Sequence, residues 1–364
     1  MMSAPSPGHE AGPAGAATQE WWGTEDACVR YGDRLALDHV SFRTVPGRVS
    51  AVVGGDGAGR TTLLRCLAGA LAVSSGRVRL PPPLRIGYLS AGSGTYPDLS
   101  VDENLAFRAS AYRLPMGVAR ERGAELLERA GLADARNRLA GQLSGGMRQK
   151  LGVIAAMLHQ PDLLVLDEPT TGIDPVSRAD LWWLIARAAA GGAAVVLATS
   201  YLDEAERAVD VLALDAGHVL ATGTPEEIAA AMPGTLWVSD ARPEGEARQR
   251  SWRRGSRWRI WDPPGQLSGH ITDLRHQNAD ESDVIMTQIR EESGIMREPG
   301  QSGGDAAGGA GRAGSAGTPD LQTVTADLQT VTPDLQDAVT VAILARELAA
   351  AAPAGGQPEG GGPR

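Results

Sequence analysis

The stretch VSAVVGGDGAGRTTLLRCL (residues 49–67) contains three patterns in a row: an apolar run, a glycine-rich turn and a second run with helical periodicity. The apolar run at residues 49–54 predicts a strand that is buried on both faces, and the helix is expected to start near Arg60. Glycines let a backbone approach a ligand closely, and the N–H groups at a helix start attract anions. The stretch therefore predicts a cradle for phosphate groups.

This cradle matches the phosphate-binding loop, or P-loop, at all but one position. The Thr61 hydroxyl is placed to bind Mg²⁺, whereas Arg60 stands where the pattern has lysine. The alternative is a glycine-rich turn without a ligand. The candidate nucleotide-binding residues of the loop are Gly54, Gly55, Asp56, Gly57, Ala58, Gly59, Arg60, Thr61 and Thr62.

A second motif, LSGGMRQK, occupies residues 143–150. Ser144 is expected to cap a helix, and Gly145 and Gly146 would expose N–H groups to an anion at the start of that helix. A helix cap alone would also explain the serine and the glycines. The motif by itself therefore does not distinguish an anion-binding site from an ordinary helix start, and the neighbouring motifs must decide.

The third motif is LLVLDEP, residues 163–169, an apolar strand that runs into two acids. An acid at the carboxyl end of a strand beside a P-loop can hold Mg²⁺ through water, which is the role expected of Asp167. The next acid, Glu168, can polarise an attacking water. Solvated carboxylates on a loop are the alternative, but the P-loop upstream favours catalysis.

The order of P-loop, LSGGMRQK, LLVLDEPTTGIDP and TSYLDEAE resembles the ATP-binding subunit of an ABC (ATP-binding cassette) transporter. The resemblance covers residues 25 to about 230 and implies an α/β P-loop NTPase fold with a RecA-like core, an antiparallel β subdomain and a helical subdomain that carries the signature. It also implies ATP and Mg²⁺ as cofactors and an ABC-type ATPase activity, with two cassettes that close head to tail on two ATP molecules.

The same resemblance implies roles for individual residues. Tyr31 would stack on adenine, Asp167 would serve Mg²⁺, Glu168 would be the catalytic base and Asp174 would couple the two sites. Each ATP would lie between one chain's P-loop and the other chain's Ser144, Gly145 and Gly146.

The stretch YLDEAERAVDVLALDAGHVLATGTPEEI is similar to drug-export and ABC-2-type exporter subunits rather than to nutrient importers. The implied partners are an integral-membrane permease subunit and a second cassette. No apolar run in the chain approaches the roughly 18 to 20 residues needed to cross a bilayer, so other chains would supply the crossing. The expected location is the cytoplasm, peripheral on the inner face of the cell membrane.

Three polar positions depart from the family pattern. Arg60 replaces the P-loop lysine, Ala91 replaces a glutamine that links Mg²⁺ to the helical subdomain, and Ser200 replaces a switch histidine that contacts the γ-phosphate. His218 is too far along the chain to substitute. Only Lys150 among 34 basic residues is a lysine, which offers a neutral explanation for Arg60 but for neither of the others.

All three departures belong to the site on this chain's own P-loop, whereas the signature that serves a partner's site is intact. We therefore expect ATP to bind but to be hydrolysed slowly there, and we expect the second cassette to be a different, more complete chain. The alternatives are a catalytically weak regulatory cassette and an ABC ATPase that does not act in transport.

The chain is expected to divide into six parts. They are a disordered tail (1–24), the ABC domain (25–231), an accessory α+β region (232–297), a flexible linker with heptad repeats (298–334), a helix (335–350) and a disordered tail (351–364).

The net charge of −10 argues against nucleic acid as the main partner. The arginine- and tryptophan-rich stretch 248–259 could bind nucleic acid or anionic lipid, although a solvated strand is the favoured interpretation.

Overall fold

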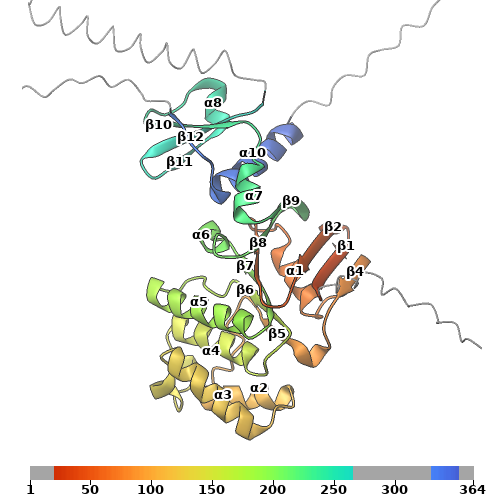
Figure 1. Ribbon diagram of the computed structural model, residues 1–364, viewed down its shortest axis with the longest axis vertical. Coiled ribbons are helices and arrows are strands. Elements are labelled where there is room, and N and C mark those ends of the chain that lie inside the picture. The colour runs from red at the N-terminus through yellow and green to blue at the C-terminus, as the bar shows by residue number, and fades with distance from the viewer. Residues whose placement is uncertain (1–19, 265–328, 352–364) are drawn as a thin grey trace, which may run out of the picture. The chain divides into compact units, whose positions relative to one another are not determined.

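The structure, a computed structural model, describes residues 20–264 and 329–351 (Figure 1). The chain divides into two compact units. The first comprises Met1–Ala230 and Asp334–Arg364, and the second comprises Ala231–Pro333. Within the described residues, no helix combines the length and the apolar character that a membrane crossing requires.

A six-stranded sheet forms the centre of the first unit, in the order β5-β6-β7-β3-β8-β9. All neighbouring strands are parallel except β8 and β9. The side chains of β6 and β7 are buried along their whole length, as expected for parallel strands covered on both faces. The strands are β3 (Val49–Val53), β5 (Ile86–Leu89), β6 (Leu163–Asp167), β7 (Ala194–Thr199), β8 (Asp210–Asp215) and β9 (His218–Gly223). The sequence-based strands at 49–54, 163–167 and 194–199 are thus confirmed to within one residue.

A smaller antiparallel sheet, ordered β2-β1-β4, packs on the same core. Its strands are β1 (Trp22–Tyr31), β2 (Arg34–Thr44) and β4 (Ser75–Arg79). Val29, Leu37 and Phe42 of this sheet join Leu63 and Leu64 of α1 (Arg60–Leu67) in one apolar cluster. The ordered chain therefore begins before residue 25, because Trp22 is buried at the start of β1.

Three helices pack against one another beside the main sheet (Figure 1). They are α2 (Val101–Ala111), α3 (Met116–Arg129) and α4 (Gly145–Met157). The sequence sets the start of α2 through a capping box, in which Ser100 and Glu103 each bond the other's backbone N–H. Two short 3₁₀ turns, Ala133–Ala135 and Ala140–Gln142, connect α3 to α4, and a third, Pro83–Arg85, precedes β5.

The remaining helices of the first unit are α5 (Pro175–Ala190), α6 (Leu202–Ala205), α7 (Pro225–Ala230) and α10 (Leu335–Ala351). Helix α10 contacts α7, β9 and α6, and its Arg346 pairs with Asp215 at the end of β8. The α/β architecture with an antiparallel subdomain and a helical subdomain confirms the predicted fold class.

The second unit is built on an antiparallel sheet with strand order β11-β12-β10-β13. Its elements are β10 (Thr235–Ser239), α8 (Gly245–Gln249), β11 (Ser251–Arg254), β12 (Arg257–Asp262) and β13 (Gln329–Thr330). The stretch 248–259 contributes to α8, β11 and β12. Strand β13 belongs to the segment expected to be a linker and pairs with Trp237 and Val238. Residues 1–19 and 352–364 of the two predicted tails, residues 265–297 of the predicted accessory region and residues 298–328 of the predicted linker lie outside the described residues.

Candidate functional site

The P-loop connects β3 to α1 and depends on glycine at two points. Gly59 has a φ of 106°, and a Cβ there would lie 2.7 Å from the carbonyl oxygen of Ala36. A Cβ at Gly54 would lie 2.3 Å from the carbonyl oxygen of Leu214. Because Gly59 is also the N-cap of α1 and offers no side chain to that helix, the first-turn N–H groups face an incoming anion without a competing cap.

Thr61 and Asp167, the two predicted metal-binding residues, lie together. The Thr61 hydroxyl donates to Oδ1 of Asp167 across 3.3 Å. Asp167 is 1% exposed, and its Oδ2 is buried without a hydrogen-bond partner in the part of the chain that the structure describes. Burial raises the pKa of the Asp167 carboxyl, partly opposed by the Thr61 hydrogen bond. A buried carboxylate with a spare oxygen beside a hydroxyl fits a hard cation such as Mg²⁺.

Glu168 follows β6 in a left-handed backbone conformation, with a φ of 51°. Its Oε1 accepts a hydrogen bond from the guanidinium of Arg60. Its Oε2 accepts from the hydroxyl of Thr171 at 2.6 Å and from that of Ser200 at 3.4 Å. The structure thus brings Arg60, Glu168 and Ser200 together. Thr171, which the sequence analysis did not single out, is a fourth member of the cluster.

The start of α4, which carries the LSGG motif, lies against the start of α5. Ser144 caps α4 by accepting from the backbone N–H of Met147 at 3.2 Å. Asp174 caps α5, because Oδ1 accepts from two backbone N–H groups at 3.0 Å. A Cβ at Gly146 would lie 2.9 Å from the hydroxyl of Ser177, whereas one at Gly145 would meet open space. Gly146 therefore permits close packing of the two helix starts, and Gly145 leaves its backbone open.

Two other candidate residues lie apart from this cluster. Tyr31 ends β1 with 45% of its surface exposed, and it and Tyr88 are hydrogen-bonded to Arg65 of α1, which raises the pKa of that guanidinium. Ala91 is exposed in the loop after β5. His218 lies at the start of β9, with Nδ1 3.4 Å from the carboxylate of Asp38.

A buried carboxylate supports the loops that hold the cluster. Glu204 is 1% exposed and accepts hydrogen bonds from Thr170 at 2.6 Å and from Thr199 at 2.9 Å. Arg178 of α5 lies 3.4 Å from its other oxygen and balances its charge. The loop after β6 is therefore tied to the loop after β7. Sequence spacing carries no signal for this contact, because the partners are about 30 residues apart.

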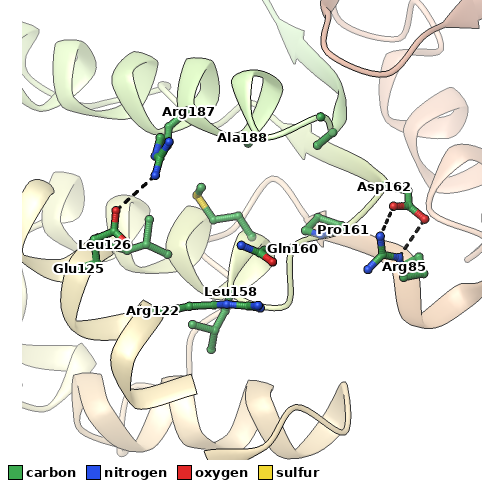
Figure 2. A pocket seen from close by; sticks show the side chains of 14 residues that line it. Arg85, Arg122, Glu125, Leu126, Leu158, Gln160, Pro161, Asp162, Arg187 and Ala188 are labelled. Carbon is green, nitrogen blue, oxygen red and sulfur yellow. Dashed lines mark hydrogen bonds and ion pairs between the residues drawn. The ribbon is translucent and has the colours of Figure 1, made fainter. Parts of the chain in front are cut away.

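A pocket of about 300 Å³ lies among α3, the end of α4 and the end of α5 (Figure 2). Figure 2 shows two ion pairs at its rim, Arg187 with Glu125 and Arg85 with Asp162. No residue of the P-loop, of the LSGG motif or of the acid pair lines it. This pocket is thus separate from the site described above.

This chain is similar to several known proteins. The family model described as ABC transporter matches residues 37–171. The daunorubicin resistance ATP-binding protein DrrA3 of Streptomyces coeruleorubidus is 39% identical over 56% of this chain and 68% of its own length. The daunorubicin/doxorubicin resistance ATP-binding protein DrrA of Streptomyces peucetius is 36% identical over 67% of this chain and 79% of its own length. The probable multidrug ABC transporter ATP-binding protein YbhF of Escherichia coli is 39% identical, and the match spans 59% of this chain but 39% of that protein.

Two solved structures of ABC transporter subunits resemble this chain. An ATP-binding subunit of an ABC transporter superposes with a TM-score of 0.55 at 26% identity, over 58% of this chain and 92% of that one. CbiO1 of Clostridium perfringens, part of an ABC transporter complex, has a TM-score of 0.52 at 25% identity, over 58% of this chain and 90% of its own. The chain therefore belongs to the ATP-binding subunits of ABC transporters and is an ABC-type ATPase.

Proposed function

We propose that this chain binds MgATP on residues 54–62 and closes with a second cassette to drive an integral-membrane permease subunit of an exporter. The observation that carries the proposal is that two neighbouring residues of the P-loop contact the acid pair, Thr61 through Asp167 and Arg60 through Glu168. In this arrangement the backbone N–H groups of the loop would hold the phosphates, and Thr61 and Asp167 would hold Mg²⁺. When bound, Mg²⁺ neutralises charge that develops on the phosphates.

The other residues of the site have distinct tasks in this proposal. Glu168 orients and deprotonates the attacking water, and the exposed ring of Tyr31 stacks on adenine. Ser144, Gly145 and Gly146 contact the ATP held by the partner cassette, because the N–H groups at the start of α4 favour an anion. Asp174 fixes the start of α5 next to them.

The known relatives of this chain support export as the process. The similar proteins include drug resistance proteins and a Nod factor export ATP-binding protein of Cupriavidus metallidurans, 36% identical over 69% of that protein. A permease partner would place this chain at the inner face of the cell membrane. The transported molecule would be selected by the permease, not by this chain.

The asymmetry of the site supports a heteromeric pair. Arg60 occupies one oxygen of Glu168, and Ser200 offers only a 3.4 Å contact to the other. Ala91 offers no side-chain donor or acceptor that could link Mg²⁺ to the helical subdomain, and Ser200 has no imidazole to contact the γ-phosphate, so slow turnover in this chain's own site is expected. A partner with a complete P-loop, completed by the intact LSGG of this chain, would supply the faster site.

Titration with a fluorescent ATP analogue, with and without Mg²⁺, tests the proposed binding site. The unmodified protein is expected to saturate, with tighter binding in the presence of Mg²⁺. Thr61→Ala is expected to lose most of the Mg²⁺ effect while Thr61→Ser retains it, because only the hydroxyl can ligate the cation. Absence of saturable binding at millimolar nucleotide, in protein shown to be folded by circular dichroism, would contradict the proposal.

A further inference from the structure

We propose that Arg60 is a positioning residue for Glu168: its guanidinium holds one oxygen of that carboxylate while the hydroxyls of Thr171 and Ser200 hold the other. The inference rests on the proposed function, because it assigns these residues to the same hydrolysis reaction. It adds that the two departures at positions 60 and 200 act on a single group.

Burial makes the Arg60–Glu168 pair a fixed contact. The Arg60 side chain is 11% exposed and that of Glu168 is 18% exposed. Arg60 lies at the start of α1 and Glu168 lies directly after β6. The backbones of these two elements therefore fix how closely the two side chains approach each other. Shielded ion pairs with restricted geometry persist, unlike exposed ones, and removing one partner leaves the other charge buried and uncompensated.

The shape of the guanidinium allows Arg60 to serve two anions at once. Nη1 donates to Glu168, while Nη2 lies 3.9 Å from the carboxylate of Asp56, whose side chain is fully exposed. A phosphate group on the P-loop would compete easily with such an exposed partner. Arginine presents five donors in a planar fork, whereas lysine offers a single point charge on a flexible stem. Arg60 can therefore hold a phosphate without releasing Glu168, and lysine at this position could not.

The remaining contacts fix the second oxygen of Glu168. Thr171, at 2.6 Å, lies on the same loop, and Ser200, at 3.4 Å, lies on the loop after β7. The carboxylate is thus held from three segments of the chain. Because Arg60 and Ser200 share this one partner, substitutions at the two positions are expected to be non-additive.

A kinetic comparison of Arg60→Lys, Ser200→Ala and the double variant tests the inference, using single-turnover ATP hydrolysis with excess protein. Arg60→Lys is expected to keep nucleotide affinity and melting temperature close to those of the unmodified protein, because the positive charge remains. It is expected to lower the rate of hydrolysis by about tenfold or more, because Glu168 loses its anchor. The double variant should lose less than the product of the two single losses.

The matched control is Arg85→Lys. Arg85 also presents a fork to a carboxylate, that of Asp162, but lies at the rim of the separate pocket. This control is expected to leave the hydrolysis rate unchanged. An unchanged or faster rate for Arg60→Lys would overturn the inference.

A second measurement does not depend on activity. Arg60→Met and Glu168→Gln are each expected to lower the urea midpoint of unfolding, and the double variant should lower it by less than the sum. Strictly additive midpoints would show that the two side chains do not hold each other, which would overturn the inference. Failure of the proposed function is distinguishable from this result, because it would appear as absent nucleotide binding in the unmodified protein.

Discussion

Glu168 illustrates, at the scale of single residues, how the loops of this fold converge. Its carboxylate receives donors from the start of α1, from its own loop and from the loop after β7. The neighbouring Asp167 instead points into the interior beside Thr61. Two adjacent acids therefore have opposite surroundings, one suited to a cation and the other to water that reaches the surface of the loop.

The glycines of the P-loop give a prediction at this scale. Gly59→Ala is expected to destabilise the fold by about 1–3 kcal/mol, because its backbone is left-handed and a Cβ would meet the carbonyl oxygen of Ala36. Gly55→Ala is the matched control, since a Cβ there meets nothing within 4 Å. Urea unfolding of both variants measures the difference, and equal midpoints would show that the loop can rearrange around Gly59.

The sequence predicted where Thr61, Asp167 and Glu168 would lie, because each occupies a fixed place relative to a strand end or a helix start. It could not identify Thr171 as a partner of Glu168, since a threonine in a loop has no distinctive pattern. It also treated Arg60 and Ser200 as separate departures. Their shared contact with Glu168 depends on side-chain geometry that sequence spacing does not encode.

At the scale of elements, the contact between the end of α2 and the residues after α4 has a pH dependence. His159 is buried and its ring stacks on that of Tyr112, with centroids 3.6 Å apart. Burial lowers the pKa of His159 to about 4. Between pH 4 and the ordinary pKa of about 6.5, His159 is protonated in the unfolded chain but neutral in the folded one. The contribution of His159 to the free energy of unfolding is therefore largest above pH 6.5 and falls as the pH drops towards 4.

The expected result is a loss of about 2–3 kcal/mol of unfolding free energy from His159 between pH 7 and pH 4.5. His159→Phe keeps a stacked ring without a titrating group, so its stability should fall less over the same range. Urea unfolding of both proteins at the two pH values measures the difference. Identical pH profiles would mean that His159 is not buried in the neutral form.

The packing of α10 in the first unit gives a second prediction for an element. Val341 is fully buried, and Val341→Ala is expected to cost about 2 kcal/mol through lost apolar contact and the cavity left behind. Val176 in α5 is 73% exposed and provides the control, for which Val176→Ala should change stability by less than about 0.5 kcal/mol. Equal effects on the urea midpoint would show that α10 does not pack stably on α7 and β9.

Sequence patterns located the elements of the core more accurately than those at its borders. Continuous apolar runs marked β6 and β7, because parallel strands covered on both faces bury nearly all of their side chains. The predicted tail, residues 1–24, overlaps the first residues of β1, because the glycine- and alanine-rich composition continues almost to the buried Trp22. Strand β13 is only two residues long and could not be predicted, since its pairing with β10 joins segments about 90 residues apart.

At the scale of the whole molecule, one set of site residues departs from the family pattern and another set keeps it. The resemblance assigns Arg60, Ala91 and Ser200 to the site on this chain's own P-loop, and all three depart from the family pattern, whereas the start of α4 retains Ser144, Gly145 and Gly146. Such a division is expected if this cassette works with a different, more complete one. A pair of identical chains would then contain two slow sites.

The ATPase rate of the purified protein alone tests this account most directly, compared with that of the triple variant R60K/A91Q/S200H. The account predicts slow turnover by the unmodified protein and an increase of about tenfold or more in the triple variant, equivalent to about 1.4 kcal/mol of barrier. R60K alone should not give this increase, because histidine at position 200 must first take over the contact with Glu168. Turnover by the unmodified protein at a rate ordinary for ABC ATPases, unchanged in the triple variant, would contradict the account.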